Sequence, residues 1–211
     1  MIFAICLCLI NSGAGILRLN AGDKDSSSMV GKIILFPIGE IEGSVLEALE
    51  KDLPAKFHAE VKRQNPMPIP EDAFHPARKQ YSSSLILKKL RGLVRSEKQE
   101  IALAIANVDL YAEGLNFVFG EAEFGGRCAV ISLTRLRQGF YSLPEKKALF
   151  TERAIKEAVH ELGHVFGIEH CPHPECVMHF SNSLMDTDKK SASFCSRCRG
   201  ILGDSSHESR H

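Results

Sequence analysis

The sequence predicts a single α/β (α+β) domain built on a mixed sheet, and three observations support this. Short apolar segments alternate along the chain with segments in which apolar residues recur at helical spacing, which is typical of layered α/β folds. The 211 residues suffice for one sizeable core and are few for two. Two consecutive predicted strands between residues 116 and 133, joined at Gly125-Gly126, indicate an antiparallel edge.

The first half of the domain is expected to hold two strands, a helix and a loop. Residues 32–36 read Lys-Ile-Ile-Leu-Phe, a run typical of a buried strand. Residues 43–51 carry apolar side chains at helical spacing and predict a helix. Residues 57–63 alternate apolar and polar and predict a second strand. Residues 64–82 contain four prolines and are interpreted as a long surface loop.

The second half continues the alternation. Residues 84–94 have the leucine spacing of a helix, and residues 101–107 form an apolar run that predicts a buried strand. Strands at 116–119 and 128–133 flank the Gly-Gly turn. Pro144 then precedes a helix that is expected to run to about Gly167.

Residues 1–28 are interpreted as a disordered N-terminal extension. They begin with a short apolar run, but no Lys or Arg precedes it, as a secretory signal would require. We therefore favour a mis-annotated start, with Met29 as the true first residue, over a weak signal-like segment. A single domain then spans 29–203, and 204–211 forms a frayed tail.

Composition excludes several classes of protein. Lys+Arg and Asp+Glu both number 26, so a basic nucleic-acid binder and a polybasic membrane anchor are not expected. No apolar run reaches the ~18 residues of a membrane span. The chain has nine histidines and seven cysteines, which gather in its last quarter and direct attention there.

Residues 160–170 read His-Glu-Leu-Gly-His-Val-Phe-Gly-Ile-Glu-His. On a helix, His160 and His164 lie one turn apart on one face and can bind the same metal ion. Glu161 lies about 100° away from His160, within reach of a water on that metal. His170 would point elsewhere on a continuous helix, but a helix end at Gly167 lets the chain fold back and present it.

Three neutral imidazoles leave one tetrahedral position open, which is typical of a catalytic zinc site. That position would hold a water whose pKa falls toward ~7, and Glu161 would act as its general base and then as a general acid.

Four cysteines form a second candidate site. Cys171 and Cys176 are spaced C-x4-C, and Cys195 and Cys198 are spaced C-x2-C. Two close pairs around a loop suit a structural zinc with four thiolate ligands, while two disulfides are the alternative. We favour the metal because the number of cysteines is odd, and a reducing compartment is therefore expected. The three other cysteines are interpreted as small buried side chains: Cys6, Cys8 and Cys128.

The segment from His160 to Cys198 resembles the archaemetzincin family of zinc metallopeptidases. It contains the metzincin signature HExxHxxGxxH, followed at matching spacing by Met178 and by the four cysteines. The resemblance implies a metzincin-like twisted sheet in an upper part, 29–167, an active-site helix, and a small zinc-bound lower part, 168–203. It also implies that Met178 is the Met-turn methionine, for which Met185 is the rival.

The sequence therefore predicts a cytoplasmic zinc-dependent metallopeptidase with two Zn²⁺ per chain and a peptide or protein substrate. By the family resemblance, the substrate would pair with an antiparallel edge strand, for which 116–119 is the candidate. Neither nucleic acid nor membrane is an expected partner, and no oligomeric state is indicated. The alternatives are a non-catalytic zinc-binding interaction protein and a hydrolase of a non-peptide amide. His173 and His179 are expected to be surface residues; Asp188 and Phe194 match the family pattern, and Phe194 is most simply a core residue.

Overall fold

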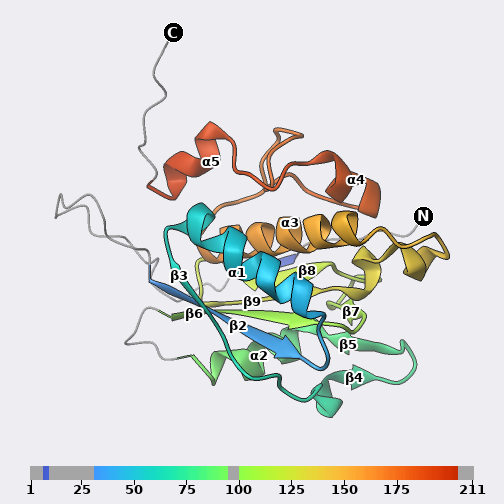
Figure 1. The fold of residues 1–211 in the computed structure, drawn as a ribbon. Helices are drawn as coiled ribbons and strands as arrows, with labels where there is room; N and C mark the ends of the chain where they lie inside the picture. Colours follow the sequence, from blue (N-terminus) through green and yellow to red (C-terminus); the bar gives the residue numbers. More distant parts are fainter. Residues whose placement is uncertain (1–6, 10–30, 95–99, 204–211) are drawn as a thin grey trace, which may run out of the picture.

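A computed structural model describes residues 7–9, 31–94 and 100–203. Its centre is a six-stranded mixed sheet (Figure 1). The strands lie in the order β1 (Leu7–Leu9), β8 (Gly120–Glu123), β9 (Cys128–Ser132), β6 (Glu100–Ala106), β2 (Lys32–Ile38) and β3 (Glu60–Arg63). Only the β8–β9 pair is antiparallel among these neighbours. The predicted mixed sheet is confirmed.

Helices cover both faces of this sheet. On one face lie α1 (Gly43–Phe57) and α3 (Lys147–Val165), and on the other lies α2 (Ser83–Arg91) (Figure 1). Two short helices, α4 (Leu184–Lys189) and α5 (Ser196–Ile201), lie beyond α3 on the side away from the sheet. A second small sheet consists of β4 (Phe74–His75), β5 (Gln80–Ser82) and β7 (Leu110–Tyr111).

Strand β6 separates two hydrophobic cores. Its large side chains, Ile101, Leu103 and Ile105, belong to the core under α1 and α3. Its intervening residues are all alanine and belong to the core under α2. The alternation follows from the two-residue period of a strand, which sends successive side chains to opposite faces. Both faces are covered, as the apolar run predicted.

The predicted strand at 57–63 is wrong at its start. Leu53 and Phe57 continue the spacing of buried side chains that begins earlier in α1, and the helix includes Pro54. His58, with φ of 47°, ends the helix in the left-handed region. Strand β3 therefore begins only at Glu60, because the apolar stripe of the helix outweighs the local alternation.

The predicted edge strand at 116–119 is also displaced. The strand that pairs with β9 is β8, four residues later. Phe117 and Phe119 alternate as strand residues would, and both enter the core under α1 and α3. The sequence of β8 is Gly-Glu-Ala-Glu, which has no apolar pattern, but Glu121 is fully buried and accepts hydrogen bonds from Ser83 and Ser84 at the start of α2.

The expectations for the loop at 64–82, for the two chain ends and for the three other cysteines have different outcomes. The expected loop at 64–82 contains β4, β5 and a 3₁₀ turn at Glu71–Ala73. Residues 1–28 were expected to be disordered, but Leu7–Leu9 form strand β1. The rest of that segment and the tail at 204–211 lie outside the described residues. The predictions for the Cys6 and Cys8 side chains also lie outside the described part of the chain, whereas Cys128 is fully buried.

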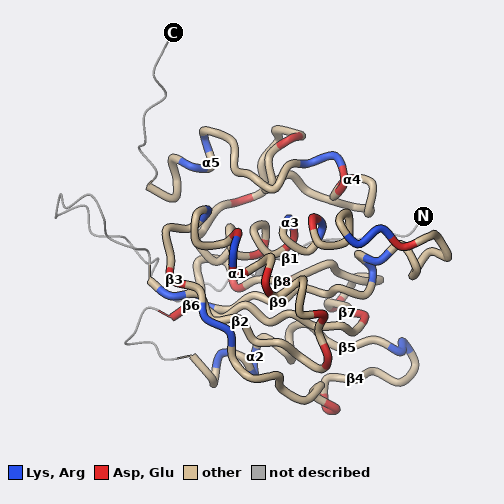
Figure 2. The backbone as a smooth tube through the Cα atoms, in the orientation of Figure 1, with Lys and Arg blue, Asp and Glu red and all other residues tan. Residues whose placement is uncertain are grey.

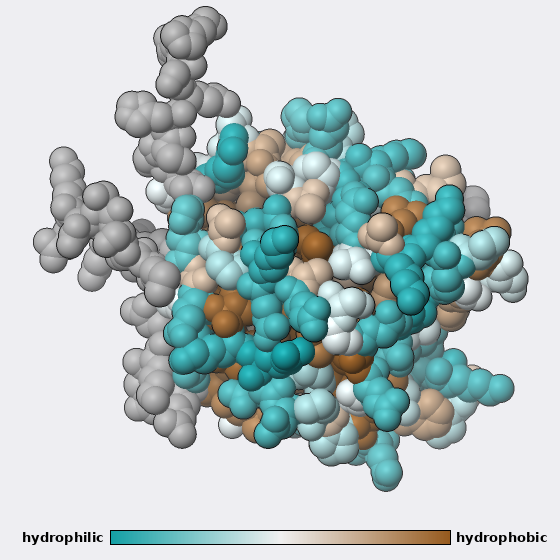
Figure 3. All heavy atoms as spheres, in the orientation of Figure 1, coloured by the Kyte–Doolittle hydropathy of each residue, from teal (hydrophilic) through white to brown (hydrophobic). Residues whose placement is uncertain are grey.

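The surface agrees with the balanced composition. Lys and Arg are interspersed with Asp and Glu over the backbone in Figure 2. The face seen in Figure 3 is mostly hydrophilic, with hydrophobic side chains in small separate patches. Within the described residues, no helix combines the length and the hydropathy that crossing a bilayer requires.

Candidate metal centres

Helix α3 presents two of the predicted ligands on one buried face. His160 and His164 lie one turn apart and are 1% and 0% exposed. Their Nε2 atoms are 3.1 Å apart. The helical spacing of the motif therefore brings both imidazoles to one point, as predicted.

Gly167 ends α3 and returns the chain toward the site. Its φ is 79°, a left-handed value that favours glycine. The N–H of Gly167 donates to the carbonyl of His164, and the N–H of Ile168 donates to the carbonyl of Gly163, at 2.9 Å each. This pair of bonds is a Schellman motif, which is how the helix end at Gly167 arises.

The turn at Gly167 brings His170 to the two helical histidines. Its ring centroid lies 5.3 Å from that of His160 and 4.7 Å from that of His164. One ring nitrogen from each residue falls within a group whose members are all within 4.8 Å of one another. Zinc–nitrogen bonds of ~2.0–2.1 Å require nitrogens about 3.3 Å apart, so the group is compact enough for one zinc ion.

Backbone carbonyls fix the tautomers of the two helical histidines. Nδ1 of His160 lies 2.7 Å from the carbonyl oxygen of Val177, and Nδ1 of His164 lies 2.8 Å from that of Ile168. A carbonyl can only accept, so Nδ1 of each ring carries the proton and donates it. The lone pair is then on Nε2, which faces the other histidines, and this is the arrangement that a zinc ligand needs.

The environment also keeps the three imidazoles neutral. Burial is the main cause that lowers the pKa of His160 well below its usual value, with the charge of Lys190 second. Burial lowers the pKa of His164 to about 3. Burial, and then the charge of Lys190, lowers the pKa of His170 to about 4. Neutral imidazole is the form that binds metal.

Glu161 is fully buried and lies against β8. A Cβ atom placed on Gly120 would come within 2.6 Å of both Cγ and Oε1 of Glu161. The carboxylate therefore occupies space that only a glycine at position 120 leaves open. Sequence reasoning missed Gly120, since a glycine at the start of a strand carries no chemical signal of its own.

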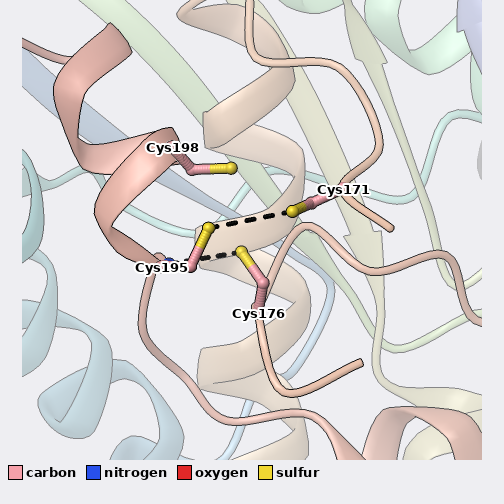
Figure 4. Close-up of side chains that lie close together, drawn as sticks. All are labelled: Cys171, Cys176, Cys195 and Cys198. Atoms are coloured by element: carbon pink, nitrogen blue, oxygen red, sulfur yellow. Dashed lines mark hydrogen bonds between the residues drawn. The ribbon is translucent and has the colours of Figure 1, made fainter. Parts of the chain in front are cut away.

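The four predicted cysteines converge on a second point (Figure 4). Cys171 and Cys176 come from the loop after α3, while Cys195 caps the N-terminus of α5 and Cys198 lies within it. Their sulfurs all lie within 4.8 Å of one another, and those of Cys171 and Cys195 are 3.7 Å apart. A tetrahedral zinc with Zn–S bonds of ~2.3 Å places its sulfurs about 3.8 Å apart, which matches this separation.

The thiol cluster contains no disulfide, since the described cysteines are all free. Burial raises the pKa of the Cys176 thiol. Burial acts in the same direction on Cys195, but hydrogen bonds with Cys198, Cys176 and Cys171 together outweigh it and lower the pKa of Cys195 to about 7. One sulfur of the four is therefore poised to become a thiolate, the form that binds metal.

A backbone hydrogen bond to Met178 links the two candidate centres. The N–H of Cys171, which directly follows His170, donates to the carbonyl of Met178 at 2.9 Å. The Met178 side chain is fully buried and packs where a Cβ on Gly163 would lie, beneath the metal-facing helix. The rival, Met185, is 68% exposed on α4. The geometry thus favours Met178 for the position under the site.

The remaining predicted residues lie around these centres. His173 is exposed, and His179 is partly buried with Nδ1 3.0 Å from the carbonyl oxygen of Cys171. Phe194 is 6% exposed and packs edge-on against Phe57, so it is a core residue. Asp188 accepts two hydrogen bonds of 2.6 Å from the guanidinium of Arg153.

Comparisons with known proteins agree with this geometry. The model of peptidase family M54 matches residues 45–203. The archaemetzincin of Pyrococcus abyssi is 47% identical over 175 residues, which is 81% of this chain and 93% of that protein. Two crystal structures of archaemetzincins have similar folds. The structure from Archaeoglobus fulgidus, in complex with malonate, has a TM-score of 0.71 and 39% identity, and the match covers 81% of this chain and 99% of that one. The structure from Methanopyrus kandleri has a TM-score of 0.73 and 38% identity, with 82% and 93% covered.

Proposed function

Because the chain belongs to peptidase family M54 and is a zinc metallopeptidase, we propose that it hydrolyses peptide bonds at the three-histidine centre. In this proposal His160, His164 and His170 hold the catalytic zinc. The observation that carries it is the direction of the lone pairs: both helical histidines donate from Nδ1 to a backbone carbonyl, which leaves Nε2 for the metal.

Glu161 would be the general base and then the general acid. When bound, zinc would polarise the peptide carbonyl and bring the pKa of a water toward neutrality. The carboxylate of Glu161 would accept the proton of that water and pass it to the leaving amine. Its position supports this role, because burial between α3 and Gly120 restricts the carboxylate to one side of the helix.

The four cysteines would hold a second, structural zinc, giving two per chain. All four positions would be occupied by sulfur, so this zinc would have no open position for substrate. Its role would be to fix the loop after Gly167. Cys171 adjoins His170 and bonds to Met178, so the same loop positions the third histidine and the Met-turn methionine.

The substrate peptide would lie extended along β8, the strand next to Glu161. In the structure Leu7–Leu9 pair with the outer side of that strand, in register with Glu121, Ala122 and Glu123. A peptide that adds to β8 as a strand would therefore take the place of β1. We further propose that the protein works in a reducing compartment, the cytoplasm, where its clustered thiols stay free for metal.

Metal analysis combined with turnover on a peptide library tests this function. Zinc in the purified full-length chain should accompany hydrolysis. A chelator should abolish hydrolysis, and added zinc should restore it. Undiminished hydrolysis after complete removal of zinc would contradict the proposal, as would a zinc-loaded protein that cleaves amides but no peptide in the library.

A further inference from the structure

A layer of buried charges lies between α3 and the segment that contains α4. Three residues of α3, Arg153, Glu157 and His160, recur at the spacing that places them along one side of the helix, and each is at most 3% exposed. Their partners come from residues 177–190 and from Leu136. Burying a charged side chain is unfavourable unless it is paired, so each charge in this layer needs a partner.

Lys190 is the most deeply buried charge in the layer. Its side chain is 0% exposed, and Nζ lies 3.2 Å from Oε1 of Glu157. The hydroxyl of Thr187 donates to the same carboxylate oxygen at 3.1 Å. The Glu157 carboxylate thus has two donors from the end of α4, and the lysine and glutamate form a closed, desolvated pair.

The pair contacts a predicted metal ligand. Nζ of Lys190 lies 3.4 Å from Nδ1 of His160, one turn along α3 from Glu157. Because Nδ1 donates its proton to Val177, the ammonium lies beside this nitrogen as a packing neighbour rather than as its donor. The non-ligating side of the ring is therefore enclosed by Val177 and Lys190, which are 13 residues apart in the lower part of the chain.

We propose that Lys190, held by Glu157, is a positioning residue for His160. It fixes the imidazole so that Nε2 stays directed at His164 and His170. This inference rests on the proposed function, since it assumes that His160 is a zinc ligand. Residues that orient a metal ligand in this way change metal affinity by ~10–100-fold when they are lost.

A purely structural role is the competing explanation, and the chain contains a matched control for it. Arg153 and Asp188 form another ion pair between α3 and α4, with N–O distances of 2.6 Å. The other hydrogen bond of Arg153 goes to the carbonyl of Leu136, so this pair contacts no predicted ligand. Removing the Arg153–Asp188 pair should destabilise the same α3–α4 interface without changing any contact of His160.

The experiment compares two charge-free variants of the full chain. In Glu157→Leu/Lys190→Met both charges are replaced by apolar side chains of similar size, which avoids a lone buried charge and which interiors often tolerate. In Arg153→Met/Asp188→Asn the control pair is removed. For each variant we would measure the urea midpoint, the zinc affinity of the histidine site by chelator competition, and kcat and KM. His160→Ala supplies the zinc signal of the cysteine site alone.

The positioning role predicts that zinc affinity and folding stability change independently of each other in the two variants. Glu157→Leu/Lys190→Met should stay folded and bind zinc at the histidine site ~10–100-fold more weakly, with kcat reduced and KM unchanged. Arg153→Met/Asp188→Asn should bind zinc within twofold of wild type, whatever its urea midpoint. Wild-type affinity in the first variant, or an equal loss in both, would overturn the inference while leaving the proposed function intact. Absence of zinc from the histidine site of wild-type protein would instead refute the proposed function.

Discussion

Gly120 lies directly against the carboxylate of Glu161, so closely that a methyl group at position 120 would come within 2.6 Å of Oε1. The first residue of β8 and the proposed general base therefore share one small space. This contact joins the sheet to α3. It makes the position of the base depend on a residue that has no reactive group.

Substituting Gly120 tests that dependence. Gly120→Ala should displace the Glu161 carboxylate, and a misplacement of about 1 Å can cost ~10²-fold in rate. We expect kcat to fall by about that factor while both zinc ions are retained, since none of the predicted ligands moves. Gly43→Ala is the control, because its added Cβ meets only Glu47 Oε1 at 3.9 Å. A wild-type kcat for Gly120→Ala, or an equal loss in the control, would refute this account of the contact.

Loss of the cysteine site should weaken zinc binding at the histidine site, whereas loss of the histidine site should leave the cysteine site intact. Cys195→Ala should reduce zinc from two ions per chain to one or fewer. It should also weaken the histidine site ~10–100-fold, because the loop that carries Cys171 also carries His170. His160→Ala should leave the cysteine-bound zinc in place. Zinc stoichiometry and thiol titration under reducing conditions check both. One zinc and two disulfides in wild-type protein would show that the cysteines are not a metal site.

Acid should release catalytic zinc only well below the ordinary range of histidine. Free imidazole takes up its proton near pH 6.5. Burial lowers the pKa of His170 to about 4 and that of His164 to about 3, so both rings stay neutral as the pH falls below 6.5. Protons therefore begin to compete for these ligands only near pH 4. Zinc retention after dialysis across pH 3–7 measures this, and loss with a midpoint near 6.5 would contradict it.

Removing the first 28 residues tests what occupies the outer side of β8. A chain that starts at Met29 lacks β1 and leaves the outer side of β8 open for a peptide. We expect this chain to fold, to bind zinc and to show a lower KM at unchanged kcat, because no segment has to leave before the peptide binds. An unchanged KM would mean that peptide and β1 do not compete for β8.

The convergence of the proposed metal ligands could be predicted because it depends on sequence-local geometry. A four-residue spacing on a helix aligns His160 and His164, and a glycine with a left-handed conformation explains the return of His170. The four cysteines lie in two close pairs, so the thiol cluster could be predicted from spacing alone. In each case the residue type and the separation carry the information.

The contacts around the ligands could not be predicted, because they join segments that are distant in the sequence. Gly120 meets Glu161 across 41 residues, and Lys190 meets Glu157 across 33. Strand β8 was misplaced because its buried Glu121 reads as polar, and only the serines of α2 explain its burial. One signal was present: Arg153, Glu157 and His160 form a polar row along one side of the helix that the sequence predicted after Pro144.

The most direct test of the central claim is the rate of peptide hydrolysis by Glu161→Gln, with zinc content measured in the same samples. Glutamine keeps the size of the side chain and removes its ability to accept a proton. We expect two zinc ions per chain, as in the wild type, and a loss of at least ~10²-fold in kcat, the usual scale for removing a general base. A wild-type rate for the zinc-loaded variant would contradict the assignment of Glu161 as the base, and with it the proposed mechanism.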